Sequence, residues 1–392
     1  MSENGNVGIV DYTAHPPPPP LTPPGLSEKP VTPAATGAAV GSELTPAQVA
    51  MNKKVLEHFQ SESYKIPGLK DGELLEVEKF WLSSDCMLRY LRATKWNSAN
   101  VAIERLESTL KWRREFGVYD DSMADLVEPE AVTGKMITFG YDTHRRPAVY
   151  MIPSRQNTEE SPRQIQFTVW MLERALDLAG PGVESVVWMI NFADKAKNPS
   201  FGTAKSVLNV LQTHYPERLS AALILNVPFL IQAFFKMISP FIDPITRNKM
   251  KFNPKPIQDG LFAADELFKD GGWGGEREFV WDHEKYWGPF VRMCAEIREG
   301  HMARWRKLGA RVGCDERDYK LGEVVDISPA PAEVDAEAET EAGDGDGDRE
   351  DAAPETGDAV AQAQIPDESS ATDKVSGDGD SDVDGVLEPT AV

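Results

Sequence analysis

The sequence contains only three cysteines and none of the common catalytic motifs. Cys86, Cys294 and Cys314 have no metal-binding or redox spacing, and their odd number favours a reducing compartment over a disulfide framework. The nucleophile elbow, the P-loop, the dinucleotide-binding glycine motif and the HExxH zinc motif are all absent. Among the six histidines, His214 lies beside Tyr215 at an expected helix end, where a structural role is favoured over a catalytic one. The sequence therefore contains no motif that indicates an enzyme.

The sequence also lacks a hydrophobic run of membrane-spanning length. Its longest apolar run, from Leu219 to Phe235, has 17 residues and is interrupted by Asn226 and Pro228, whereas a spanning helix needs about 20. The first residues have neither the basic nor the apolar segment of a signal peptide. We therefore expect a soluble, cytoplasmic protein in which this run is a strand that leads into a helix.

Both ends of the chain have the composition of disordered segments. Residues 1–45 carry five consecutive prolines, Pro16 to Pro20, which favours a flexible spacer with polyproline II character over a ligand for an SH3-type partner. Residues 326–392 hold 21 acidic and two basic residues, a net charge of −19 out of −22 for the whole chain. The Gly-Asp repeat at 343–348 lacks the closing glutamate of a calcium loop, so we expect an acidic tail and no metal site.

The region between these ends shows two kinds of pattern. Residues 46–125 have helical spacing of apolar residues, with a helix start at Thr45 and Pro46. Strands and helices then alternate over 126–281, which predicts an α/β domain with a largely parallel sheet, and 282–325 are expected to add C-terminal helices. The expected strands are 134–140, 148–153, 185–192, 221–226 and 250–252, and the expected helices include 85–93, 98–116, 162–179 and 201–215.

One short segment combines apolar and charged residues. The helix expected at 228–238 carries Phe229, Ile231, Phe234, Phe235 and Ile238 over much of its surface. A helix that is apolar nearly all round is either buried in the core or faces an apolar ligand or a bilayer. Glu217 precedes this helix, and Thr246 and Lys249 follow it closely. This combination indicates a site for a ligand that is both apolar and charged.

Five short motifs occur within residues 80–310. They are Leu-Arg-Tyr-Leu-Arg-Ala at 88–93, Lys-Trp-Arg-Arg at 111–114, Arg-Pro at 146–147, Tyr-Pro-Glu-Arg at 215–218 and Pro-Phe-Ile-Asp-Pro-Ile-Thr at 240–246. With this combination, the chain resembles the CRAL-TRIO lipid-binding family, in its fungal phosphatidylinositol-transfer branch. The segments 154–158 and 163–166 are most similar to the sub-branch linked to azole and multidrug resistance.

The resemblance implies a fold, a ligand and a set of contact residues. It implies an N-terminal helical domain and a lipid pocket that is floored by a mixed, largely parallel sheet and closed by a mobile gate helix at about 228–240. The residues that would bind the phosphatidylinositol headgroup are Arg92, Glu217, Thr246 and Lys249. The residues that would form the apolar pocket and gate are Trp188, Phe229, Phe234, Phe235 and Ile238. In these roles Lys249 and Arg92 would neutralise the phosphodiester, and Glu217 would accept hydrogen bonds from inositol hydroxyls.

The central strand departs from the family pattern. The founding member of the family binds phosphatidylcholine through hydroxyl residues on this strand, where the present chain has Val186 and Trp188. A choline lipid would leave its phosphate unpaired against an apolar wall, at a cost of about 1–3 kcal/mol. The expected second ligand is therefore a sterol or another apolar lipid.

These observations together predict a lipid-transfer protein that exchanges phosphatidylinositol against this second lipid. We expect transient contact with the endoplasmic reticulum, lipid droplets or the plasma membrane, no nucleic-acid partner and no cofactor beyond the bound lipid. A sensor that presents phosphatidylinositol to a kinase or another partner without transferring it is the first alternative. A lipid hydrolase that lacks the usual motif is the second, and turnover of a lipid ester would identify it.

Overall fold

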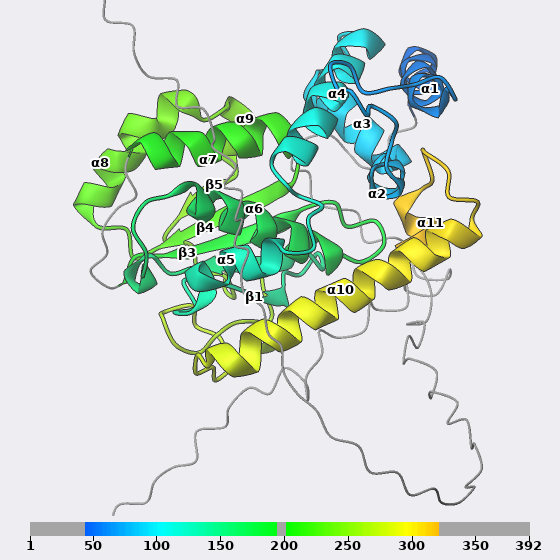
Figure 1. The fold of residues 1–392 in the computed structure, drawn as a ribbon. Coiled ribbons are helices and arrows are strands. Elements are labelled where there is room, and N and C mark those ends of the chain that lie inside the picture. The colour runs from blue at the N-terminus through cyan, green and yellow to red at the C-terminus, as the bar shows by residue number, and fades with distance from the viewer. Residues whose placement is uncertain (1–43, 194–200, 321–392) are drawn as a thin grey trace, which may run out of the picture. The chain divides into compact units, whose positions relative to one another are not determined.

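The computed structural model describes residues 44–193 and 201–320 (Figure 1). The predictions for the proline-rich N-terminus, including Pro16–Pro20, and for the acidic tail therefore lie outside the described residues. The predicted limits of the domains remain predictions.

Four helices form the N-terminal module, in the region where the apolar spacing predicts helices. They are α1 (Pro46–Gln60), α2 (Glu76–Trp81), α3 (Ser84–Ala93) and α4 (Ala99–Glu115). Polar side chains start three of them: Thr45 forms a reciprocal capping box with Gln48, and Ser83 and Ser98 accept hydrogen bonds from backbone amides of α3 and α4. The apolar faces of the helices meet in a core that includes Met87, Leu91, Leu106 and Leu110.

A five-stranded sheet follows in the chain. Its strands are β1 (Met136–Tyr141), β2 (Pro147–Met151), β3 (Val186–Asn191), β4 (Leu219–Leu225) and β5 (Met250–Phe252). They are ordered β1-β2-β3-β4-β5, and β1 is antiparallel to β2 while the other neighbours are parallel. The mixed, largely parallel sheet is thus confirmed. The second predicted strand, 148–153, ends two residues later than β2, because Pro153 starts a short 3-10 turn, η1 (Pro153–Arg155).

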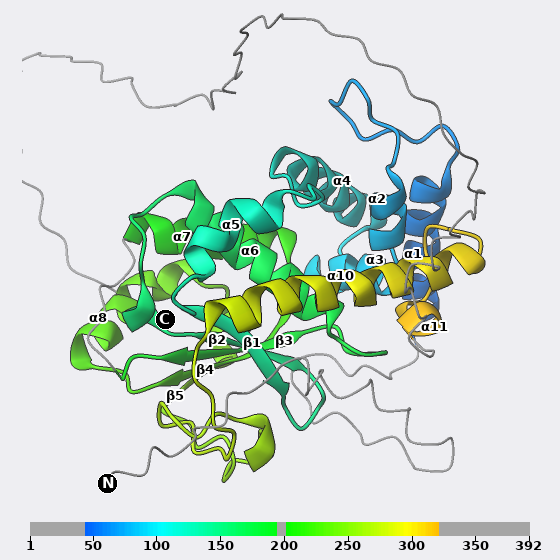
Figure 2. The ribbon, with the colours of Figure 1, turned by 60° about the horizontal axis from the view of Figure 1, so that its bottom comes forward.

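The two faces of the sheet pack against different parts of the chain (Figure 2). On one face, Trp188, Ala222 and Met250 lie at the same level of β3, β4 and β5. Tyr150 points to the opposite face, where its ring contacts Phe268 with 4.5 Å between centroids. The segment between β5 and α10 therefore covers this second face and leaves the first for helices.

The helices of the α/β part are α5 (Met123–Ala131), α6 (Pro162–Asp177), α7 (Phe201–His214), α8 (Phe229–Ile238) and α9 (Pro244–Asn248). Short 3-10 turns lie at η2 (Ser239–Phe241) and η3 (Ala264–Glu266). Figure 2 shows α5, α6 and α7 on the same side of the sheet. Helix α5 is not among the helices predicted from the sequence, and it contains Pro129, a residue that is unfavourable inside a helix.

The C-terminal helices are α10 (His283–Lys307) and α11 (Glu316–Lys320). Figure 1 shows α10 running along the sheet part to the helical module. Near its start, Trp287 packs on Trp170 of α6 at 4.7 Å between ring centroids. Near its end, Trp305 contacts Phe80 of α2 at 5.6 Å. A single long helix therefore contacts both α6 and the helical module.

Candidate functional site

A large cavity lies between the sheet and the helices α6, α7 and α8. Its volume is about 1990 Å³, roughly twice the upper end of the 300–1,000 Å³ that is typical of pockets for drug-sized ligands. Its apolar lining includes Phe167 and Leu172 of α6, Val207 and Leu211 of α7, Trp188 and Ile190 of β3, and Ala222 and Ile224 of β4. The sheet therefore floors a cavity of the size that a lipid with its acyl chains requires.

Helix α8 closes one side of this cavity with only part of its apolar surface. Phe234, Phe235 and Ile238 line the cavity, together with Trp188 on the sheet. Phe229, the fifth residue of the predicted apolar set, instead points away and is 85% exposed. Of the five residues predicted to form the apolar pocket and gate, four therefore line the cavity. Helix α8 is thus not a buried core helix.

The outer surface of α8 and the segment after it is also apolar. Besides Phe229, the exposed apolar side chains of this region are Met237, Phe241, Ile245 and Phe252. Met237 is 50% exposed and Ile245 is 59% exposed. Exposed apolar side chains that gather in one region are typical of surfaces that meet a protein or a membrane.

Charged residues gather at one edge of the sheet. Arg146, Glu184, Glu217 and Lys249 lie one or two residues before the parallel strands β2, β3, β4 and β5, respectively. Because the amino ends of parallel strands meet at the same edge, these four side chains share one end of the cavity, and all of them line it. Arg92, in the last turn of α3, reaches the same end from the helical module.

Two of the predicted headgroup residues are bonded directly to each other. Nε of Arg92 donates to Glu217 Oε2 over 2.6 Å, and Nη2 of Arg92 is 3.2 Å from Glu184 Oε2. Glu217 has a φ of 60°, in the left-handed region that non-glycine residues rarely occupy. Strained backbone of this kind concentrates at ligand sites, which supports a functional role for Glu217.

Thr246 of α9 and Lys249, the residue after this helix, line the cavity. The side chain of Asp243 caps this helix by accepting from the amide of Thr246 at 2.9 Å. Nζ of Lys249 donates to the carbonyl of Leu219 over 2.6 Å. Burial lowers the pKa of Lys249, and the carboxylates of Glu217 and Asp243 oppose this shift. All four predicted headgroup residues thus line one cavity.

Two further polar groups at this edge, Arg146 and Ser220, were not predicted from the sequence as site residues. Nη1 of Arg146 donates to Oγ of Ser220 over 2.7 Å, and both residues line the cavity. Arg146 was noted only as part of a motif, and Ser220 was not noted. Both residues lie beside the amino ends of β2 and β4. Their proximity could be predicted from the sequence only if the order of the strands were already known.

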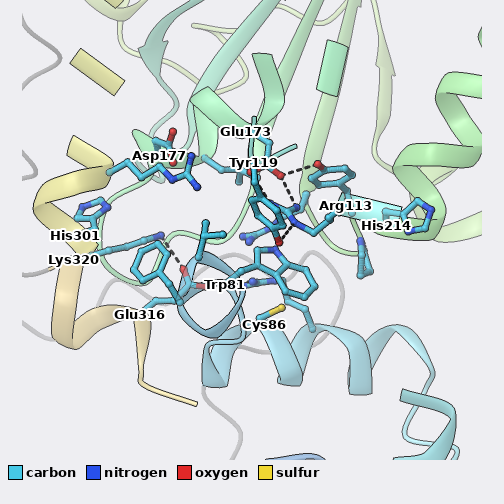
Figure 3. A pocket seen from close by; sticks show the side chains of 18 of the residues that line it. Trp81, Cys86, Arg113, Tyr119, Glu173, Asp177, His214, His301, Glu316 and Lys320 are labelled. Atoms are coloured by element: carbon cyan, nitrogen blue, oxygen red, sulfur yellow. Dashed lines mark hydrogen bonds and ion pairs between the residues drawn. The ribbon is translucent and has the colours of Figure 1, made fainter. Parts of the chain in front are cut away.

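A second, much smaller cavity lies where the helical module meets α6 and α11 (Figure 3). Its volume of about 90 Å³ has room for a few water molecules but not for a lipid. Beside it, Arg113 donates to Glu173 at 2.7 Å, and the hydroxyl of Tyr215 donates to the same carboxylate at 2.7 Å. Burial alone would raise the pKa of Glu173, but Arg113 and Tyr215 together lower it to about 2.

His214 has structural contacts, in line with the role favoured from the sequence. Its ring stacks on Trp112 with centroids 4.1 Å apart, and Nδ1 lies 3.1 Å from the hydroxyl of Thr109. Burial and the nearby charge of Arg105 lower the pKa of His214 to about 4. A neutral imidazole therefore holds the end of α7 against α4.

Two features are absent from the described residues, 44–193 and 201–320. No helix in these ranges is long and apolar enough to cross a membrane. No three histidine, cysteine or acidic side chains in these ranges converge as metal ligands.

The fold and the site define an α/β protein with a lipid-sized cavity, an apolar wall and a charged edge. Two family models match the chain: the CRAL/TRIO N-terminal domain over residues 51–108 and the CRAL/TRIO domain over residues 131–262. The phosphatidylinositol transfer protein PDR17 of Saccharomyces cerevisiae is 39% identical over 305 residues, which cover 71% of this chain and 85% of that protein. The chain belongs to the CRAL/TRIO family, which confirms the resemblance seen in its motifs.

Two further matches complete the comparison. A CRAL-TRIO domain-containing protein of Schizosaccharomyces pombe is 46% identical over 286 residues, 71% of this chain. The present chain spans only 28% of the length of that relative. The crystal structure of Sfh5 aligns with a TM-score of 0.44 and 15% identity, over 66% of this chain and all of that one.

Proposed function

We propose that this protein carries phosphatidylinositol and exchanges it between membranes against a second, more apolar lipid. One observation carries the proposal: the four headgroup residues expected from the sequence line the same cavity as the apolar residues of β3 and α8. The similarity to a phosphatidylinositol transfer protein along 85% of its length supports the same activity. Membership of this family favours a lipid carrier over a lipid hydrolase.

The proposed roles follow from the chemistry of the headgroup. Carboxylates accept hydrogen bonds, so Glu217 is suited to inositol hydroxyls, whereas Lys249 is suited to the phosphodiester. The hydroxyl of Thr246, at the same end of the cavity, offers a further donor. The acyl chains then extend along the apolar wall formed by Trp188 and α8.

The preference for one lipid over another is expected to depend on these polar contacts. Each buried methylene contributes about 0.8 kcal/mol, but the same methylenes are already buried in a bilayer, so this contribution nearly cancels on transfer. Hydrogen bonds to charged groups are worth about 1.5–3 kcal/mol each. The headgroup contacts therefore decide which lipid is retained, while the apolar wall allows the lipid to be carried.

The second lipid is proposed to be a sterol or a similarly apolar molecule. The side chains that β3 contributes to the cavity wall, Trp188 and Ile190, offer a lipid phosphate no hydroxyl or cationic partner. Loading and release require α8 to move, and its exposed outer surface is suited to transient contact with a bilayer. The protein would then act in the cytoplasm and at the periphery of membranes.

The test is identification of the lipids that co-purify with the protein, followed by transfer assays between vesicles. A double variant, Glu217→Ala with Lys249→Ala, should lose phosphatidylinositol and its transfer but retain the second lipid. Lys53→Ala with Glu57→Ala is a matched control, because this exposed pair lies on α1. A wild-type protein that neither holds nor moves phosphatidylinositol would disprove the proposal. Normal binding without transfer would instead support a lipid sensor.

A further inference from the structure

Two cationic side chains converge on neighbouring residues at the start of β4. Nζ of Lys249 is bonded to the carbonyl of Leu219 at 2.6 Å, and Nη1 of Arg146 is bonded to the hydroxyl of Ser220 at 2.7 Å. Arg146 comes from the turn before β2 and Lys249 from the turn before β5, so they approach from opposite sides. Both line the large cavity.

These two cations are poorly matched by carboxylates. The nearest carboxylate to Arg146 is Asp142, whose Oδ2 is 3.5 Å from Nη1. Oδ1 of Asp142 already accepts from the backbone amides of His144 and Arg146 at 2.9 Å each. Among the described residues, no carboxylate lies within ion-pair distance of Lys249, which is bonded to a backbone carbonyl instead.

Arg92 provides the contrast. Its guanidinium lies between two carboxylates, at 2.6 Å from Glu217 and 3.2 Å from Glu184. To bind a phosphate, Arg92 would first have to give up at least one of these ion pairs. Arg146 would not, because among the described residues its Nε and Nη2 groups have no hydrogen-bond partner.

The positive charges of Arg146 and Lys249 also affect each other. Burial is the main cause of the lowered pKa of Lys249, and the positive charge of Arg146 lowers it further. Two like charges that face a partly buried cavity are stabilised by an anion placed between them. A guanidinium with two donors still available can form the paired hydrogen bonds that phosphate oxygens accept.

We infer that Arg146 and Lys249, with the hydroxyl of Ser220 holding the guanidinium in place, form the site for the phosphodiester of the bound lipid. Arg92 keeps its bond to Glu217 and orients that carboxylate toward the inositol hydroxyls. This inference rests on the proposed function and changes the expected role of Arg92 from phosphate ligand to positioning residue. The ligand class is an anionic phospholipid with one phosphodiester group.

The test compares full-length variants by their bound lipid. Arg146→Gln should reduce the phosphatidylinositol held per protein on the order of tenfold or more, as expected for the loss of a hydrogen bond to a charged group. The amount of the second lipid should not fall. Arg292→Gln is the matched control, because Arg292 is an exposed residue of α10 and does not line the cavity.

A direct readout is the ³¹P chemical shift of the bound phosphatidylinositol. Arg146→Lys keeps the charge but loses the paired donors, so the protein should remain loaded and the shift should change. Arg92→Gln should leave the shift unchanged. If Arg146→Gln does not fold, the ³¹P shift of Arg146→Lys alone tests the inference.

Two results would overturn the inference. One is full loading and an unchanged shift in both Arg146 variants; the other is a changed shift in Arg92→Gln alone. A wild-type protein without phosphatidylinositol would refute the proposed function itself. The two failures are therefore distinguishable.

Discussion

Arg92 and Glu217 are bonded to each other across two parts of the fold, with Nε of Arg92 2.6 Å from Oε2 of Glu217. Arg92 lies in the last turn of α3 in the helical module, and Glu217 stands two residues before the first residue of β4. The charged edge of the cavity therefore includes a residue of the N-terminal module. Under the proposed function, this contact would give the module a part in lipid selection.

The backbone of Glu217 offers a first prediction. Glu217→Gly and Glu217→Ala both remove the carboxylate, but only glycine adopts a φ of 60° without strain. The glycine variant should therefore be more stable than the alanine variant by about 1 kcal/mol. Both should lose phosphatidylinositol equally. Urea unfolding together with lipid analysis checks this, and equal stability of the two variants would mean that the strain is relieved elsewhere.

The buried ion pair between Arg113 and Glu173 predicts how the stability of the protein depends on pH. The pKa of Glu173 is about 2 in the folded protein, below the ordinary value of about 4.3 in an unfolded chain. The ionised carboxylate therefore contributes stability that is complete above about pH 4.3 and is lost as the pH falls toward 2. The contribution is on the order of 3 kcal/mol.

Glu173→Gln tests this contribution. The variant should be less stable at pH 7, because Arg113 is left buried without its counter-charge. Its free energy of unfolding should also fall less than that of the wild type between pH 4.3 and pH 2. Parallel slopes for the two proteins in this range, measured by denaturant titration, would assign the acid sensitivity to other groups.

The sequence predicts the elements of this fold better than the contacts that build the site. Helix starts depend on local residues such as Thr45 and Ser98, so they are readable from the sequence. The bond between Arg146 and Ser220 joins positions 74 residues apart, and it depends on the order of the strands. Likewise, Phe229 points outward because of the way α8 is rotated against its neighbours. This rotation cannot be predicted from the sequence, because the apolar residues of α8 lie on all sides of the helix.

The exposed surface of α8 and its neighbours leads to a prediction about membranes. Phe229→Ser with Met237→Ser should weaken binding to vesicles several-fold and slow lipid transfer, because less apolar area enters the bilayer. The lipid content of the purified protein should stay the same, since neither side chain lines the cavity. Leu126→Ser is the control, because Leu126 is similarly exposed but lies on α5. Unchanged vesicle binding in the double variant would show that the docking surface lies elsewhere on the protein.

The charge of the tail should oppose docking on anionic membranes. Residues 229–255 carry five basic side chains and one acidic side chain, whereas residues 326–392 have a net charge of −19. A chain that ends at residue 325 should therefore bind anionic vesicles more tightly than the full chain at about 0.01 M salt. The difference should nearly vanish at about 1 M salt, where the screening length falls from about 30 Å to about 3 Å. Neutral vesicles are the control and should bind both proteins equally. A difference that persists at high salt, or on neutral vesicles, would show that the tail acts by a route other than charge repulsion.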